Sequence, residues 1–166
     1  MKILLTILPV LFFTSCINPF APALTDSDGN EYSLGDQKTI DGFFQMFQYA
    51  YNMKDTIIYS NLLAPNFIFA YTNFEKGIDL TLSREEDMLT TYRLFNASKK
   101  IDFTWNKIVI QEGNNVEQNI SRSFSLTVTF SPTDIEYVSG KVYFVIKRDN
   151  ENENWQLTYW QDDSYY

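Results

Sequence analysis

Apolar residues in the first part of the chain recur at the spacing of an α-helix. Between residues 40 and 52 they return every three or four positions, which predicts an amphipathic helix. Its expected inner face consists of Ile40, Phe43, Phe44, Phe47, Ala50 and Tyr51. Its expected outer face carries the polar residues Asp41, Gln45, Gln48 and Asn52.

Two further helices are marked by the residues at their first turns. Asp55 is a typical N-cap, and we expect a short helix after it that ends before Pro65. Ser83 and Glu86 have the spacing of a capping box, in which each side chain bonds the free amide of the other residue. The third helix is expected to bury Met88, Leu89, Tyr92 and Phe95 on one face.

Beyond residue 100 the pattern changes to the alternation of β-strands. Four long strands are predicted, at residues 101–111, 120–130, 138–147 and 155–161. In the first of these strands the residues expected to face the core stand at odd-numbered positions up to Trp105 and at even-numbered positions from Ile108. This change near Asn106 and Lys107 predicts a β-bulge. A shorter strand is expected at 67–71, and residues 73–82 are expected to form a loop.

The element order predicts an α+β domain with three N-terminal helices packed on a curved antiparallel sheet. The order of elements over residues 39–162 resembles the cone-shaped NTF2-like superfamily, which includes polyketide-cyclase-like and ketosteroid-isomerase-like proteins. The aromatic first helix leading into residues 62–67, and the last strand at 155–160, carry the resemblance further. A different α+β roll is the alternative fold.

The N-terminus begins with Lys2 and continues with a short apolar run that ends in Phe13-Thr14-Ser15-Cys16. The run is shorter than the about 20 residues that span a bilayer, and it has the features of a secretory signal. The last four residues resemble the lipobox of bacterial lipoproteins, although Phe13 stands where Leu is usual. The resemblance implies acylation of Cys16, with chains such as palmitate. An ordinary cleaved signal is the alternative.

These patterns divide the chain into residues 1–15 as signal peptide, 16–38 as lipidated N-terminus and linker, and 39–166 as the domain. We expect a lipid-anchored protein of the bacterial cell envelope. Because Ile17 is not an acidic retention signal, the expected location is the outer membrane, facing the periplasm or the surface. Asp26, Asp28 and Asn30 have part of the spacing of a calcium loop, but Gln37 stands where the closing Glu belongs, so we expect a solvated linker.

Composition excludes several kinds of partner and chemistry. Without residues 1–15, 12 basic and 21 acidic residues remain, so the net charge is −9, which argues against nucleic-acid binding. The chain has no histidine, and its single cysteine is the expected lipid site, so we expect neither a metal site nor a cofactor. Any catalysis would rely on Asp, Glu, Tyr or Lys.

In the NTF2-like superfamily the cup between helices and sheet often holds a small apolar ligand, and some members perform acid–base chemistry there with an Asp and a Tyr. By this resemblance, the candidate catalytic residues are Asp102, Asp79 and Tyr51, with Tyr59 and Tyr71 as further hydroxyl donors. The candidate pocket-lining residues are Phe47, Tyr51, Tyr71, Trp105 and Trp155. We see no pair whose sequence spacing brings a carboxyl and a phenol together.

Three functional hypotheses follow. The first is a lipid-anchored module that binds a small apolar ligand or an envelope protein. The second is a histidine-free acid–base enzyme of the isomerase or dehydratase kind, which requires a carboxyl inside the cup. The third is a structural or assembly lipoprotein that acts as a homodimer.

Overall fold

The computed structural model describes residues 34–73 and 77–165. The predicted signal peptide, Cys16 and most of the predicted linker lie outside the described residues. The helices are α1 (Ile40–Met53), α2 (Thr56–Leu62) and α3 (Arg84–Ala97). The strands are β1 (Leu63–Asn73), β2 (Ile78–Ser83), β3 (Lys100–Gly113), β4 (Glu117–Ser131), β5 (Asp134–Lys147) and β6 (Gln156–Tyr165).

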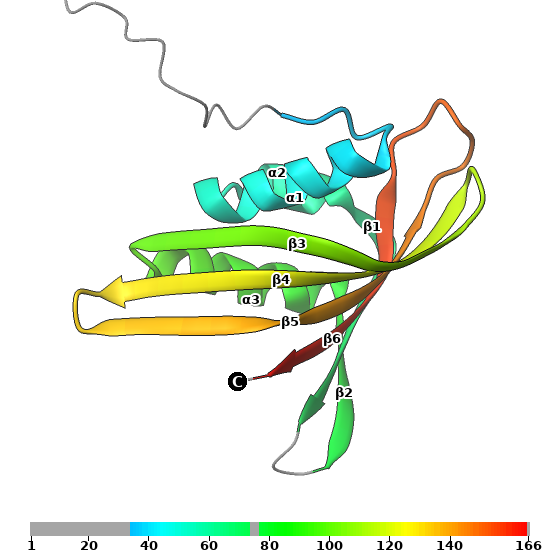
Figure 1. Ribbon diagram of the computed structural model, residues 1–166. Helices are drawn as coiled ribbons and strands as arrows, with labels where there is room; N and C mark the ends of the chain where they lie inside the picture. The colour runs from blue at the N-terminus through cyan, green and yellow to red at the C-terminus, as the bar shows by residue number, and fades with distance from the viewer. Residues whose placement is uncertain (1–33, 74–76, 166) are drawn as a thin grey trace, which may run out of the picture. The chain divides into compact units, whose positions relative to one another are not determined.

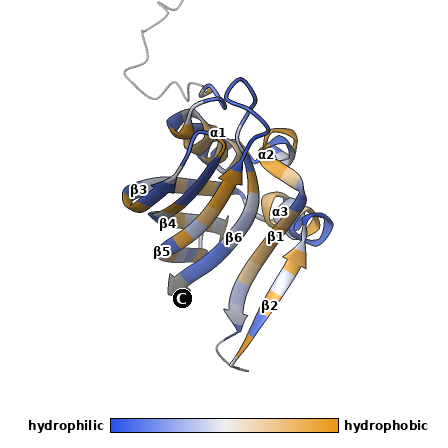
Figure 2. Cartoon of the chain, turned by 90° about the vertical axis from the view of Figure 1, so that its right-hand side faces the viewer, coloured by the Kyte–Doolittle hydropathy of each residue, from blue (hydrophilic) through white to orange (hydrophobic). Residues whose placement is uncertain are grey.

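The strands form one six-stranded sheet in the order β2-β1-β6-β5-β4-β3. Strands β3 to β6 are antiparallel neighbours, as predicted, whereas β1 runs parallel to β6. In Figure 1, α1 runs alongside β3, and α3 lies on the same side of the sheet. Figure 2 shows the alternation of hydrophobic and hydrophilic positions along the strands. The predicted α+β architecture is therefore confirmed.

The bulge expected in the first long strand is present. The pairing of β3 with β4 shifts register between Trp105 and Ile108, and again between Ile108 and Ile110. Up to Trp105 the buried residues of β3 alternate, and beyond the shift the strand is exposed. The bulge therefore ends the part of β3 that contributes to the core.

The predicted helix caps are also present. Asp55 accepts hydrogen bonds from the amides of Ile57 and Ile58, each at 2.9 Å. Ser83 and Glu86 form the capping box. The two bonds from Ser83 hold the pKa of the exposed Glu86 carboxyl below its usual value, because they favour its charged form.

Two predictions about the middle of the chain are wrong in whole or in part. Much of the expected loop at 73–82 is strand β2, which pairs with β1. Ile78, Leu80 and Leu82 alternate with Asp79 and Thr81, which is the pattern of a strand, although no residue of β2 is fully buried.

The expected inner face of α3 is wrong in part: Phe95 is buried and Met88 packs against the core, as predicted. Leu89 and Tyr92 are exposed, whereas the buried residues of α3 are Asp87, Thr91 and Phe95.

The polar side of α1 covers the edge of the sheet. β3 is an edge strand, whose outward backbone groups have no neighbouring strand. Asn52 bonds both the amide and the carbonyl of Phe103, and Gln48 accepts from the amide of Trp105 at 3.3 Å. These side chains thus satisfy backbone groups that would otherwise need water or another strand.

The chain just before α1 is packed onto the domain. Gln37 is buried, and its side-chain amide donates to the carbonyl of Trp155 at 2.8 Å. The amide of Trp155 in turn donates to the carbonyl of Gln37 at 3.1 Å. Although the predicted linker includes Gln37, its contacts are those of the domain.

Candidate ligand site on the concave face of the sheet

The base of the cup between α1 and the sheet is filled with aromatic rings. Phe47 on α1 lies at the centre and is 1% exposed. Its ring centroid is 5.0 to 5.8 Å from those of six neighbours, which are Tyr51, Tyr59, Phe103, Trp105, Phe144 and Trp160. Aromatic pairs at such distances add to the stability that burial supplies. This part of the cup is core.

Further along the concave face, an aromatic wall of Phe69, Tyr71 and Trp160 is only half-buried. Phe69 pairs in register with Trp160, and their ring centroids are 4.8 Å apart; the Phe69 and Tyr71 centroids are 5.6 Å apart. The indole N–H of Trp160 is buried and has no hydrogen-bond partner among the described residues. Buried polar groups are nearly always hydrogen-bonded, so we expect an acceptor from outside the described residues to bind this N–H group.

A polar cluster lies within the apolar interior beneath α1, α2 and α3. The Tyr59 hydroxyl on α2 donates to Asp87 Oδ2 on α3 at 2.7 Å. The Tyr51 hydroxyl is within hydrogen-bonding reach of the hydroxyls of Tyr59 and Thr91. Asp87 and Thr91 are each 5% exposed. One carboxyl and three hydroxyls therefore form a connected network sealed from water.

Burial governs the ionisation of this polar cluster. It raises the pKa of Asp87 to about 6, and the hydrogen bond from Tyr59 opposes the shift only in part. Burial also raises the pKa of Tyr51 and of Tyr59, and the nearby charge of Asp87 adds to both shifts. The phenols therefore stay protonated near neutral pH, while Asp87 is the group of this cluster that can exchange a proton there.

A second carboxylate lies between the polar cluster and the aromatic wall. Asp162 on β6 pairs in register with Tyr71 on β1 and with the buried Val142 on β5, so it faces the concave side. Its charge adds to the rise of the Tyr51 pKa. The concave face therefore combines apolar rings, one orphaned donor and a carboxylate.

Asp102 and Asp79, the carboxylates predicted from the sequence, do not lie in the cup. Asp102 is flanked by the buried Ile101 and Phe103, so it points to the other face of β3, where it pairs with Lys100 at 2.8 Å. Asp79 is exposed on β2 and accepts from Thr72 at 2.8 Å. The sequence analysis did not select Asp87, because it lies in the first turn of a helix. Acidic residues are common there, since they interact favourably with the helix dipole.

The other predicted residues occupy three environments. Phe47 and Tyr51 belong to the filled base of the cup, and Tyr71 belongs to the aromatic wall. Trp105 is buried and donates its indole N–H to the carbonyl of Phe44 at 2.9 Å. Trp155 is 2% exposed and lies under the Arg148 guanidinium, 4.2 Å from the ring centroid. No sequence signal distinguished Phe69 and Trp160 from core residues.

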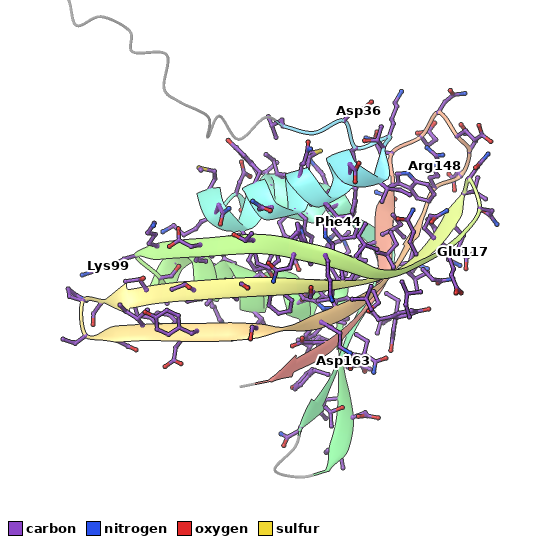
Figure 3. The ribbon with its side chains drawn as sticks, in the orientation of Figure 1. Asp36, Phe44, Lys99, Glu117, Arg148 and Asp163 are labelled. Carbon is purple, nitrogen blue, oxygen red and sulfur yellow. The ribbon has the colours of Figure 1, made fainter. Side chains whose placement is uncertain are left out.

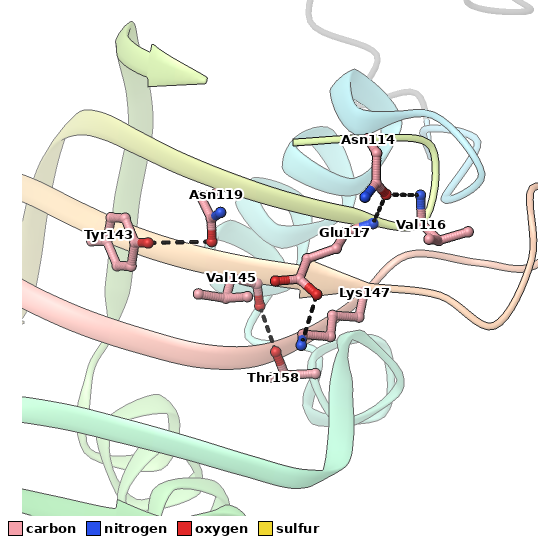
Figure 4. Close-up of polar contacts among 8 residues, drawn as sticks. All are labelled: Asn114, Val116, Glu117, Asn119, Tyr143, Val145, Lys147 and Thr158. Carbon is pink, nitrogen blue, oxygen red and sulfur yellow. Dashed lines mark hydrogen bonds and ion pairs between the residues drawn. The ribbon is translucent and has the colours of Figure 1, made fainter. Parts of the chain in front are cut away.

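A large outer groove, of about 710 Å³, lies at the end of the sheet where Glu117 and Arg148 are found (Figure 3). Figure 4 shows that three of its polar side chains already have partners: Lys147 pairs with Glu117 at 2.9 Å, and Thr158 donates to the carbonyl of Val145 at 3.0 Å. Most of its lining residues are polar, whereas small-molecule sites are lined mainly by apolar and aromatic side chains. The concave face is the better candidate.

Over residues 34–73 and 77–165, no group of three or more Asp or Glu side chains is arranged to hold a metal ion. None of the helices in the same ranges combines the length and apolar character needed to cross a membrane.

Comparison with solved structures gives the fold class. The chain is similar to an NTF2-like superfamily protein from Salmonella enterica, with a TM-score of 0.62 and 9% identity over 78% of this chain and 91% of the other. The domain therefore has the NTF2-like fold. No protein-family model and no curated protein sequence matches the chain.

Two other similar structures carry names that refer to dehydratases. One, from Novosphingobium aromaticivorans, is provisionally named a scytalone dehydratase; it has a TM-score of 0.65 and 12% identity over 76% of this chain and 82% of the other. The second, from Streptomyces avermitilis, is provisionally named a dehydratase of the NTF2-like family. Its TM-score is 0.61, with 12% identity over 76% of this chain and 94% of the other. At these identities the likeness defines the fold alone.

Proposed function

We propose that this chain is a lipid-anchored protein of the bacterial cell envelope whose domain binds a small, largely apolar molecule against the aromatic wall. The observation that carries the proposal is the buried indole N–H of Trp160, which has no hydrogen-bond partner among the described residues and lies beside the half-buried rings of Phe69 and Tyr71. Aromatic surface with one oriented donor is the usual composition of such sites. The ligand would have a flat apolar body and one acceptor.

Fluorescence titration with two naphthalene probes tests the site. Acetonaphthone has a carbonyl acceptor, and ethylnaphthalene has the same apolar body without it. Trp160→Phe keeps an aromatic ring but removes the N–H donor. It should therefore weaken the binding of acetonaphthone by about tenfold and change the binding of ethylnaphthalene little. Phe69→Ala should weaken both probes. Tyr137→Ala is the matched control, because Tyr137 is 74% exposed and neighbours the concave-face residue Val138 on β5. Unchanged binding in Trp160→Phe and Phe69→Ala contradicts the proposal.

The anchor is tested separately. The resemblance of Phe13-Thr14-Ser15-Cys16 to a lipobox supports acylation of Cys16. Labelled palmitate should enter the wild-type chain and the membrane fraction should contain it. Cys16→Ala should accumulate as an unprocessed precursor without label. A normally cleaved, soluble Cys16→Ala product would show that Cys16 is not the processing site.

An acid–base enzyme is the second candidate function, and the Asp87–Tyr59 pair favours it. Asp87 combines a pKa of about 6 with a hydrogen bond from a phenol, two of the features that a histidine-free isomerase or dehydratase needs. The dehydratase names of two similar structures point in the same direction. The enzyme requires that ligand reach Asp87. Acetonaphthone binding should then shift the ¹³C carboxyl titration of Asp87, and an unchanged titration in the saturated complex argues for binding alone.

A further inference from the structure

A small hollow lies at the rim of the cup, on the opposite side of the core from the aromatic wall. Its volume is about 130 Å³, and we call it the rim hollow; it is lined by Asp41, Phe44, Gln45, Gln48, Trp105 and Arg122. At roughly 30 Å³ for each water molecule, it has room for about four waters. A ligand with only a few non-hydrogen atoms would fill it.

The rim hollow exists because the polar side of α1 continues past the end of the regular part of β3. The side chain of Asn52 is hydrogen-bonded to the backbone of Phe103, and that of Gln48 to the backbone of Trp105. Gln45 and Asp41 come next along the same side of the helix, but β3 shifts register after Trp105. These two side chains therefore border the hollow instead of a strand.

Arg122 on β4 forms the other wall of the rim hollow. Its guanidinium lies 4.7 Å from the ring centroid of Phe44 and 5.5 Å from that of Trp105, and Nε donates to the carbonyl of Asn106 at 3.1 Å. Phe44 itself is held between α1 and the sheet (Figure 3). The terminal Nη groups make no hydrogen bond to any described residue. Partial burial lowers the pKa of Arg122, so the site favours a ligand that neutralises this charge.

Asp41 faces the same hollow without pairing with Arg122. The two residues form no ion pair within the described chain, although the charge of Asp41 acts on Arg122 and opposes the fall of its pKa. Opposite charges on two sides of one hollow select against a dianion such as phosphate, which Asp41 repels. They equally select against a simple cation, which Arg122 repels.

We infer that the rim hollow binds a small α-amino acid, with its carboxylate on the Arg122 guanidinium and its ammonium group on Asp41. Arginine binds carboxylates through two parallel N–H donors, which matches the two Nη groups that bond no described residue. The stacking of the guanidinium on Phe44 and the bond to Asn106 hold this fork in place before ligand arrives. The inference goes beyond the proposed function, since it needs neither the lipid anchor nor the aromatic wall.

Calorimetric titration of the full chain in detergent tests the inference with four probes: L-alanine, acetate, methylammonium and inorganic phosphate. L-Alanine should bind with a Kd on the order of 1 mM, and the three other probes should bind at least about tenfold more weakly. L-Alanine carries both charges, so only it should use both walls.

Three variants assign the binding to the rim hollow. Asp41→Asn, at an exposed position, should lower the affinity for L-alanine to the level of the affinity for acetate. The affinity for acetate itself should not fall. Arg122→Lys keeps the charge but loses the fork, and should weaken L-alanine and acetate alike. Asp102→Asn, outside the hollow, is the control. Absence of saturable L-alanine binding, equal affinity for acetate or phosphate, or unchanged binding in Asp41→Asn would overturn the inference. Failure of the aromatic-wall test would leave these outcomes unaffected.

Discussion

The side chain of Asn52 forms a two-point hydrogen bond with the backbone of Phe103. Its Oδ1 accepts from the Phe103 amide at 2.6 Å, and its Nδ2 donates to the Phe103 carbonyl at 3.1 Å. An amide side chain on α1 thus takes the place of a neighbouring strand at the edge of the sheet. The pairing attaches the helix to the sheet at one register and seals the cup along β3.

Asn52→Ala should lower the free energy of unfolding by about 1–3 kcal/mol, because it leaves a half-buried amide and carbonyl without partners. Hydrogen exchange at the Phe103 amide should become faster than at buried amides of β4. Asn106→Ala is the control, since the Asn106 side chain bonds only the exposed Ser125 hydroxyl, at 3.1 Å, among the described residues. Equal exchange in both variants would show that Asn52 does not protect the edge.

Asp87 should make the domain less stable as pH rises from about 4 to 6. Its pKa is raised in the folded state from 3.8 to about 6, so over this range the folded chain binds more protons than the unfolded chain, and unfolding becomes easier with increasing pH. The shift corresponds to about 3 kcal/mol.

Asp87→Asn should remove this contribution, because a neutral amide can still accept the Tyr59 hydrogen bond. Urea unfolding at several pH values measures the difference between wild type and variant, which should grow in favour of Asp87→Asn between pH 4 and 6. Asp102→Asn, at an exposed carboxylate, should not show this growth. A difference independent of pH would mean that Asp87 keeps its ordinary pKa.

Phe47→Ala should open a cavity at the base of the cup. Truncation of a fully buried Phe typically costs about 3–5 kcal/mol, and the cavity would be lined by the rings that now surround Phe47. A dry apolar cavity of this kind binds benzene or xenon. Benzene should therefore raise the Tm of Phe47→Ala and leave the wild type unchanged. Equal responses would indicate that the wild-type cup already has free apolar space at its base.

Gly42→Ala should displace the segment before α1. A Cβ at Gly42 would overlap the backbone of Asp36, which neither side can relieve by a side-chain rotation. We expect a loss of about 1–3 kcal/mol and weaker protection of the Trp155 amide, which donates to Gln37. Gly77→Ala is the comparison: its cost should be about 1 kcal/mol, from its positive φ of 61° alone, since its Cβ would meet nothing within 4 Å. A Gly42→Ala loss no larger than this would contradict the close packing.

Local signals in the sequence predicted the elements they control. Asp55 and the Ser83–Glu86 pair set the starts of α2 and α3, because caps act within one helical turn. The alternation along residues 120–130 predicted β4, because one of its faces lies on the core. The change of parity near Asn106 likewise predicted the bulge. Strand β2 was missed although Ile78, Leu80 and Leu82 alternate with Asp79 and Thr81, because the alternation is short and no residue of β2 is fully buried.

Only the tertiary structure decided which polar residues are functional candidates. Asp87 and Thr91 lie on the buried face of α3, whereas polar residues in a sequence usually indicate the exposed face of a helix. The pKa of Asp87 is raised because segments distant in the sequence bury it. Asp41 and Arg122 likewise meet at one hollow although they belong to α1 and β4. Periodicity reports whether a residue faces apolar or polar surroundings, whereas a site depends on which surfaces pack together. The sequence by itself therefore determined most of the elements and the fold class, and long-range packing determined the sites.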